Sequence, residues 1–229
     1  MKTIVVKRKI LLVILCFGLI SCSLLGIVFG AKLAFSKPAI SKTIVIDAGH
    51  GGIDGGATGK TTNVNESYLN LVYAKRLEQI CKEFGFKVVM TRKDMNGLYD
   101  ETAKSKKKSE MEKRKDIIES AKPDAVVSLH MNSFSDKNVR GAHVFYGQDN
   151  QAGQELAENV AECLNRNIKY AYKNVKVGDY FVLNNSKCAS ILVECGFLSN
   201  PEEEQLLQQD DYIQKFCYNI FCGIYLFFK

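Results

Sequence analysis

Short apolar runs alternate with longer segments of helical periodicity along most of this chain, and this alternation constrains the fold more than any other feature. The apolar runs have the length and composition of buried strands and lie at residues 43–47, 87–91, 125–129 and 189–195. Strands that alternate with helices form a mostly parallel sheet with helices on both faces. The sequence therefore predicts an α/β fold of this kind.

The remaining segments complete this pattern. Two further strands are expected at residues 141–146 and 180–183. The lysine-rich segment 104–108 is expected to be a solvated loop. Helices are expected from Asn65 to Gly85, through Ile117 and Ile118 to Pro123, and over residues 154–170 and 211–228.

The charge of the chain is distributed unevenly. The formal net charge is +6, and the basic residues that lie before residue 43, with no acidic residue among them, account for the whole excess. The rest of the chain is close to neutral. A basic N-terminus on a neutral domain indicates a membrane-directed segment and not a nucleic-acid-binding surface, so we expect no nucleic acid among the partners.

The N-terminal segment has the features of a membrane span. Residues 10–31 contain no charged side chain, and a helix of about 22 residues covers the ~30 Å hydrocarbon core of a bilayer. The basic cluster before it places residues 1–9 in the cytoplasm. We expect an uncleaved signal-anchor, a linker over residues 32–42 and one domain over residues 43–229.

Two alternatives remain for this segment. A cleaved signal peptide has the same charged start and apolar centre. The run Leu19-Ile20-Ser21-Cys22 also resembles a bacterial lipobox, which would make Cys22 a lipidation site. Under each of the three interpretations the domain is extracytoplasmic.

Six cysteines lie in the domain, and none forms a Cys-x-x-Cys pair. Most fall at apolar positions of helix or strand patterns. A free cysteine packs like a small hydrophobic residue, and a domain of this size does not need disulfides for stability. We expect these cysteines to be core residues.

Residues that commonly bind metals recur at the carboxyl ends of the predicted strands. His50 lies in the glycine-rich turn 47–52 that follows the first strand, His130 ends the third, and Glu194 ends the strand within residues 189–195. Glu66 falls in the first turn of a helix, where the helix dipole favours an ionised carboxylate. Because ligands of α/β sheets bind beyond the carboxyl ends of the strands, we expect these four side chains to converge.

The chemistry of this set suits Zn²⁺. Two imidazoles and one carboxylate, from His50, Glu66 and His130, are a typical donor set for a catalytic zinc ion with an open position. Such an ion polarises a carbonyl oxygen and lowers the pKa of water to about 7. A separate carboxyl group must then move the proton to the leaving nitrogen of an amide, and Glu194, between apolar neighbours and Gly196, is the candidate.

Each residue alone has a more ordinary interpretation. An isolated His50 or His130 would more often be a structural histidine, and an acid at a helix start is usually a favourable cap. The joint placement favours the metal site, because the chain has three histidines and two lie at predicted strand ends. We expect the third, His143, to be structural or to face the substrate. The glycines of the turn are expected to clear space for that substrate.

Five segments in this order resemble the motifs of the zinc-dependent N-acetylmuramoyl-L-alanine amidases, the amidase 3 family, over essentially all of residues 43–229. The segments are Asp47-Ala48-Gly49-His50-Gly51-Gly52, Asn65-Glu66, Ser128-Leu129-His130-Met131-Asn132, Gly141-Ala142-His143-Val144-Phe145-Tyr146 and Leu192-Val193-Glu194-Cys195-Gly196-Phe197-Leu198-Ser199-Asn200. The resemblance implies a three-layer α/β/α sandwich around a six-stranded sheet. It also implies zinc on His50, Glu66 and His130, catalysis by Glu194, and hydrolysis of the bond between muramic acid and L-alanine in peptidoglycan.

The compact form, with one N-terminal apolar segment and no wall-binding repeats, is similar to the CwlD-type amidases of spore-forming bacteria. That similarity implies action on spore cortex peptidoglycan, in the muramic-δ-lactam pathway, from the forespore intermembrane space. A zinc carboxypeptidase or endopeptidase on stem peptides, and a non-catalytic peptidoglycan-binding module, are the alternatives.

An accessory protein could complete or regulate the site. Glu66 follows the loop over residues 55–64, which we expect to be mobile, and its position depends on that loop. The insertion over residues 93–115 is where we expect regulation or contact with such a partner.

Overall fold

The computed structural model describes residues 41–229. The predicted cytoplasmic N-terminus, signal-anchor and most of the linker lie outside the described residues. Within residues 41–229, no helix combines the length and the apolar character that crossing a membrane requires.

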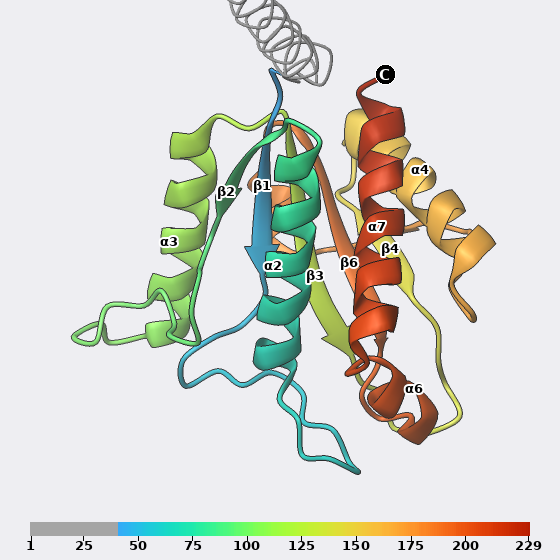
Figure 1. The fold of residues 1–229 in the computed structure, drawn as a ribbon. Coiled ribbons are helices and arrows are strands. Elements are labelled where there is room, and N and C mark those ends of the chain that lie inside the picture. Colours follow the sequence, from blue (N-terminus) through green and yellow to red (C-terminus); the bar gives the residue numbers. More distant parts are fainter. Residues whose placement is uncertain (1–40) are drawn as a thin grey trace, which may run out of the picture. The chain divides into compact units, whose positions relative to one another are not determined.

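A six-stranded sheet forms the centre of the domain, with the strand order β2-β1-β3-β6-β4-β5 (Figure 1). Only the pairing of β4 with β6 is antiparallel, and the other neighbouring strands run parallel. The predicted mostly parallel six-stranded sheet is confirmed. The strands are β1 (Thr43–Ala48), β2 (Lys87–Met90), β3 (Ala125–Asn132), β4 (His143–Tyr146), β5 (Lys176–Val177) and β6 (Ala189–Phe197).

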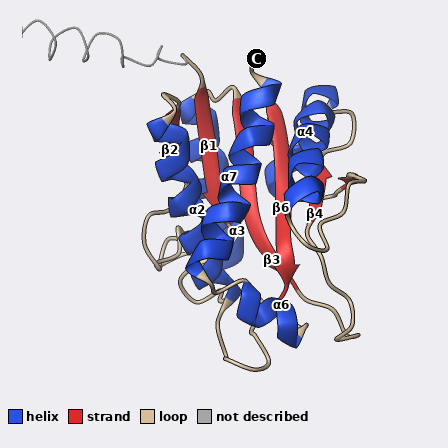
Figure 2. Ribbon diagram, turned by 45° about the vertical axis from the view of Figure 1, so that its right-hand side comes forward, coloured by secondary structure: helices blue, strands red, loops and turns tan. Residues whose placement is uncertain are grey.

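Helices cover both faces of the sheet, which confirms the three-layer sandwich (Figure 2). The helices are α2 (Glu66–Glu83), α3 (Lys106–Ala121), α4 (Gln151–Asn167), α5 (Phe181–Asn184), α6 (Pro201–Leu206) and α7 (Asp210–Phe227). Helices α2, α4 and α7 pack over one face, and α3 and α5 pack over the other.

Strand alternation decides which side chains reach each face. Ile44 and Ile46 of β1 belong to the large apolar cluster beneath α2, α4 and α7, whereas Val45 belongs to the small cluster that includes Ile118 of α3. Because successive side chains of a strand point to opposite faces, Asp47 lies on the same face as Val45. By the same rule His130 shares the face of Val126, so the polar positions at the strand ends lie on the α3 side.

Two expectations from the sequence are wrong. Residues 180–183 form no strand: the chain makes the short strand β5 at Lys176–Val177 and then the one-turn helix α5. A four-residue apolar run is too short to show a helical or a strand period. The lysine-rich segment 104–108 is also not simply a loop, because α3 begins at Lys106, where the Ser105 side chain accepts a hydrogen bond from the Lys108 amide as an N-cap.

Helix α6 was not predicted from the sequence. Asn200 caps it by accepting hydrogen bonds from the amides of Glu202 and Glu203, and Pro201 occupies its first turn. This Asn-Pro start followed by acidic residues is a helix N-terminus pattern that the sequence already contains. Strands β3 and β6 also extend further than expected, so His130 and Glu194 lie inside strands.

Candidate functional site

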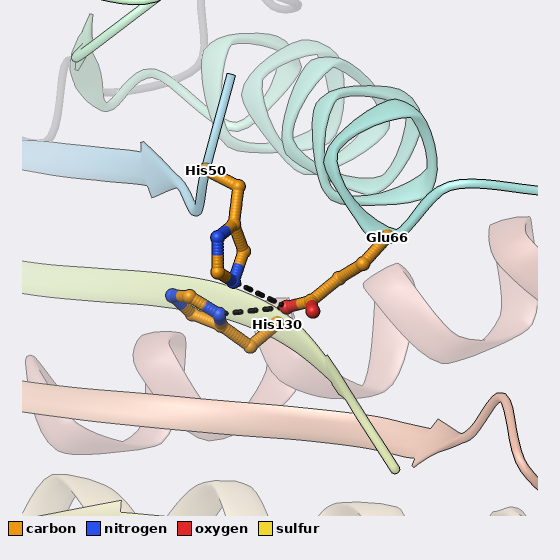
Figure 3. Close-up of side chains that lie close together, drawn as sticks. All are labelled: His50, Glu66 and His130. Carbon is orange, nitrogen blue, oxygen red and sulfur yellow. Dashed lines mark hydrogen bonds and ion pairs between the residues drawn. The ribbon is translucent and has the colours of Figure 1, made fainter. Parts of the chain in front are cut away.

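Three of the four predicted site residues meet at the carboxyl ends of β1 and β3. The ligand atoms of His50, Glu66 and His130 all lie within 4.8 Å of one another (Figure 3). Glu66 Oε1 is 3.1 Å from His50 Nε2 and 2.8 Å from His130 Nδ1. The three side chains come from the turn after β1, the first residue of α2 and strand β3, so the expected convergence is present.

The turn that carries His50 is strained and firmly held. His50 has φ +59°, in the left-handed region that non-glycine residues rarely adopt. Arg114 donates hydrogen bonds to the carbonyl oxygens of Ala48, at 2.8 Å, and His50, at 2.5 Å. Arg92 donates to the carbonyl oxygens of Ala48 and Gly49. Two buried guanidinium groups therefore fix the backbone that presents His50.

Arg114 is itself held by buried carboxylates. It pairs with Asp47 and, at 2.6 Å, with Glu110 one turn earlier in α3. The carboxyl group of Asp47 also accepts hydrogen bonds from Thr91, at 2.7 Å, and Ser128, at 2.6 Å. Burial alone would raise the pKa of Asp47, but Arg114 and the two hydroxyl groups outweigh it and lower the pKa to about 2.

The glycines around the site make room for the candidate ligands themselves. A Cβ atom at Gly49 would collide with the imidazole ring of His130. A Cβ atom at Gly56, where φ is +67°, would collide with the carboxylate of Glu66 and the ring of His50. At Gly49 the structure thus corrects the expectation that the turn glycines clear space for substrate.

Further contacts orient His50 and Glu66. Asp54 Oδ1 is 2.9 Å from His50 Nδ1, and Lys107 Nζ is 2.6 Å from the other oxygen of Asp54. Glu66 accepts hydrogen bonds from the amides of Ala57, at 2.8 Å, and Met131, at 3.2 Å. A carboxylate behind a histidine fixes the ring orientation and raises its basicity, which favours metal binding.

The electrostatics of the group favour charged donors. Burial would raise the pKa of Glu66, but the neighbouring His130 and His50 lower it well below its usual range. Burial would lower the pKa of His50, but Glu66 and Asp54 raise it. Two imidazoles and an ionised carboxylate at these distances fit a divalent metal ion, which would replace the protons that the histidines share with Glu66.

Glu194 lies beside this group on β6. It pairs with His130 across the β3–β6 register. Its side chain is buried, and Oε2 has no hydrogen-bond partner among the described residues. Burial raises the pKa of Glu194 to about 7; the charges of His130 and His50 oppose this shift, and that of Glu66 adds to it. The group can therefore gain or lose a proton near neutral pH.

A cavity of about 110 Å³ opens next to the site on the α3 side of the sheet. His50 and His130 line one part of it, and Tyr180 and Phe181 line another. The imidazoles are thus reachable from a space bounded by aromatic side chains.

His143 lies outside the group that could hold a metal. It begins β4, opposite Glu194 in the antiparallel β4–β6 pair. Its ring stacks on Tyr172, with 4.2 Å between centroids, and meets the edge of Phe197. These contacts give it a structural role in an aromatic cluster.

The loop before Glu66 is anchored by α6. The Glu204 carboxylate accepts hydrogen bonds from the amides of Thr61, at 2.8 Å, and Thr62, at 2.6 Å. The adjacent Glu203 accepts from the amides of Gly141 and Phe197, so it ties the segments before β4 and at the end of β6. These contacts argue against the expected mobility of the loop over residues 55–64.

The residues that support the site were not predicted from the sequence. Arg114 could have been found, because it is the only arginine in an otherwise lysine-rich helix and has Glu110 four residues before it. Asp54 lies four residues after His50, a spacing that suits a contact within a turn. Nothing in the sequence pattern distinguished Glu203 and Glu204 from exposed acids of a helix start.

A His–Glu–His group beside a separate buried carboxyl group is typical of metallohydrolases. The model of the N-acetylmuramoyl-L-alanine amidase family, Amidase_3, matches residues 44–225. The chain belongs to this family and is a peptidoglycan amidase, which confirms the resemblance that the five motifs indicated.

Individual relatives agree with this assignment. The germination-specific N-acetylmuramoyl-L-alanine amidase of Bacillus subtilis (strain 168) is 31% identical over 85% of this chain and 83% of its own length. The probable cell wall amidase LytH of Staphylococcus saprophyticus is 30% identical over 76% of this chain, which spans 54% of that protein. The CwlD amidase from Clostridioides difficile, solved in complex with the GerS lipoprotein, superposes with a TM-score of 0.78 and 35% identity, covering 82% of this chain and 98% of that one.

Proposed function

We propose that this amidase hydrolyses the amide bond between N-acetylmuramic acid and L-alanine with a zinc ion held by His50, Glu66 and His130 and with Glu194 as the proton carrier. The observation that carries the proposal is the convergence of three ligand atoms within 4.8 Å, next to the buried Glu194, whose Oε2 atom has no hydrogen-bond partner within residues 41–229. Two histidines and a glutamate are one of the donor sets that catalytic zinc sites use.

The residues of the site have separate roles in hydrolysis. Zinc, when bound, supplies a Lewis acid that polarises the scissile carbonyl and lowers the pKa of the attacking water. Glu194 accepts the proton of that water at its carboxylate and returns it to the amide nitrogen, so that the peptide leaves as a neutral amine. Burial raises its pKa to about 7 in the metal-free fold, and a nearby cation would favour the carboxylate form that accepts the proton. Asp54 holds the ring of His50, and Arg114 holds the turn behind it.

We further propose that the enzyme works outside the cytoplasmic membrane, held by residues 10–31 as a signal-anchor, and that its substrate is spore cortex peptidoglycan. The uncharged stretch over residues 10–31 supports the anchor. The name of the germination-specific relative supports a role connected with spores. The muramic-δ-lactam pathway and the forespore intermembrane space are the pathway and location that we propose with it, from the similarity of the chain to the CwlD-type amidases.

An accessory protein is part of this proposal. The CwlD amidase was solved with the GerS lipoprotein, and we propose that a partner contacts the insertion over residues 93–115 of this chain. That insertion includes Lys107, which binds Asp54, so a partner there could influence the position of His50.

The reaction is tested with the purified full chain and intact muropeptides, analysed by mass. We expect free stem peptides that begin with L-alanine, together with sugars that lack a peptide. Cleavage within the stem peptide would contradict the assigned bond and identify a carboxypeptidase or endopeptidase. If the zinc-loaded protein cleaved nothing, the result would instead identify a non-catalytic binding module.

The roles are separated by two variants measured for both zinc content and turnover. Glu194→Gln should keep zinc and lose about 10²–10⁴-fold in turnover, because it cannot carry the proton. His130→Ala should lose zinc as well as activity. Glu202→Gln, which alters an exposed acid of α6, is the matched control and should change neither quantity. Equal loss of zinc from the Glu194 and His130 variants would overturn the division of roles.

A further inference from the structure

The outer side of α7 carries an exposed apolar face next to the end of α2. Tyr218, Tyr225 and Leu226 expose 45%, 42% and 51% of their surface. They border a shallow groove of about 470 Å³ whose floor includes Phe84 and Phe221, with their rings tilted at 35° to each other and 4.4 Å between centroids. We call Tyr218, Cys222, Tyr225 and Leu226 the α7 face. None of the other described helices covers these exposed side chains.

The domain begins at the same end of the molecule as this face. Figure 1 shows the start of β1 and the C-terminus of α7 at one end, opposite the carboxyl ends of β1 and β3. Lys42 Nζ lies 5.5 Å from the centroid of the Phe228 ring, which joins the first residues of the domain to the last turn of α7. The polypeptide that enters here contains the uncharged residues 10–31 only a short linker earlier.

Lysines surround this end of the domain. Lys42, Lys87 and Lys229 are exposed, and Lys87 is the register partner of Thr43 at the first position of β1. Acidic side chains share the region and have partners of their own: Asp124 pairs with Lys42, Glu78 pairs with Lys82, and Glu83 accepts a hydrogen bond from Gln79. The charge at this end suits a negatively charged planar partner.

We propose that the α7 face rests on the headgroup region of the anionic bilayer that holds residues 10–31. This inference relies on the membrane anchor of the proposed function. Tyrosine rings with a polar tip favour the interface of a bilayer, and lysine side chains can extend their amines into the headgroups. The linker over residues 32–42 spans at most about 40 Å, so the face stays at high effective concentration near the lipid and needs little affinity of its own.

This contact sets the direction of the active site. Strand β3 begins at the lipid end, and His130 is its sixth residue, which places it about 17 Å along the strand at ~3.3 Å per residue. With the last turns of the α7 face on the bilayer, His50, Glu66 and His130 lie at the end of the sheet that is farther from the lipid. The fold thus presents the site to peptidoglycan while the anchor end stays on the lipid.

The test uses the full chain in vesicles and a single tryptophan, since the natural sequence contains none. Tyr225→Trp places a reporter on the α7 face. Tyr68→Trp is the matched control, because Tyr68 is 51% exposed and lies in the first turn of α2, at the opposite end. Vesicles contain phosphatidylglycerol and lipids brominated near the headgroup, which quench a tryptophan in contact with them.

We expect at least a two-fold loss of fluorescence for the Tyr225→Trp protein, little loss for the Tyr68→Trp protein, and a smaller difference in purely zwitterionic vesicles. Equal quenching of the two reporters, or none in either, would overturn the proposal. The tryptophan at position 225 could also escape quenching by brominated lipid and become shielded from iodide as the protein concentration rises. That result would assign the α7 face to contact with a second copy of the chain and would also overturn the proposal.

Flotation of the vesicles and hydrolysis of muropeptides by the same samples separate this inference from the proposed function. A protein that fails to float with the vesicles overturns the anchor and this inference together. A protein that floats and cleaves, but whose 225 reporter stays unquenched, overturns only the orientation on the bilayer.

Discussion

Glu194 lies where its negative charge is disfavoured unless a cation is nearby. Burial raises its pKa to about 7 in the metal-free fold, whereas in an unfolded chain the carboxyl group titrates near 4.5. Below pH 4.5 the carboxyl group is protonated in both the folded and the unfolded state, so its ionisation does not change the free energy of unfolding. Between pH 4.5 and about 7, Glu194 is ionised mainly in the unfolded chain, so the free energy of unfolding falls as the pH rises. Above pH 7 this loss of stability reaches its full value, roughly 3 kcal/mol at about 1.36 kcal/mol per pH unit.

The first prediction follows from this decrease in the free energy of unfolding with rising pH. In the presence of a chelator, Glu194→Gln should become progressively more stable relative to the natural protein as the pH rises from 4.5 to about 7, because the amide cannot ionise. Denaturant unfolding at a series of pH values measures the difference, and Glu202→Gln should show no such trend. A difference between the Glu194 variant and the natural protein that stays constant with pH would contradict the raised pKa.

The second prediction concerns Asp54, which contacts His50 Nδ1 at 2.9 Å. Asp54→Asn removes the charge that orients the ring and should weaken zinc binding about 10–100-fold, as loss of a carboxylate behind a metal-binding histidine commonly does. Competition with a chromogenic chelator measures the affinity. Asp149→Asn, at an exposed loop position, serves as the control. Unchanged zinc affinity in the Asp54 variant would show that Asp54 does not act through His50.

At this scale the sequence predicted which candidate ligands lie close together, but not the residues that support them. His50 and His130 are conspicuous because the chain has only three histidines and these two lie at predicted strand ends, and Glu66 lies at a predicted helix start. Arg92 and Arg114 act through backbone carbonyl oxygens that become adjacent only when β1, β2 and α3 pack together. No spacing in the sequence encodes such a contact.

Helix α6 shows how a short element can order distant segments. Its neighbouring residues Glu203 and Glu204 point their carboxylates at different loops: Glu203 binds the amides of Gly141 and Phe197, and Glu204 binds those of Thr61 and Thr62. The Asn-Pro start of α6 was predictable from sequence, but these long-range partners were not. Helix α5 was not predictable at all, since one turn has no measurable period.

The third prediction uses this pair as reciprocal controls. Glu204→Gln should raise hydrogen exchange at the Thr61 and Thr62 amides about 10–100-fold, the range expected for loss of a hydrogen bond to a charged group. Glu203→Gln should instead affect Gly141 and Phe197. Exchange resolved by residue measures both effects. If the two variants loosened the same segment, α6 would act by overall packing and not through separate anchors.

At the scale of the whole molecule, the sequence predicted the architecture because the alternation of apolar runs and helical patterns is strong in β1, β3, β6, α2 and α7. The sequence did not predict that the apolar clusters on the two faces of the sheet differ so much in size. The large core lies beneath α2, α4 and α7, and only a small cluster around Val45 and Val126 lies on the α3 side. His130 and Glu194 lie on that thinner side, where few helices separate them from solvent.

The candidate metal ligands join parts of the fold that are distant in sequence. The turn after β1, the start of α2 and the end of β3 supply one ligand each, so an ion bound by all three recognises only the folded domain. Zinc at about 100 times its dissociation constant should then stabilise the protein by ~2.7 kcal/mol. For a domain of this size, that corresponds to a rise in Tm of roughly 5–10 °C.

Thermal unfolding with zinc and with a chelator measures this fourth prediction, and the three histidines of the chain provide its controls. His130→Ala should abolish the zinc-dependent rise in Tm, because one of the three ligands is gone. His143→Gln should lower the baseline Tm by disturbing the stack with Tyr172, yet keep the rise, because His143 lies outside the metal-binding group. A rise that survived in the His130 variant and vanished in the His143 variant would place the ion elsewhere and exchange the roles of the two residues.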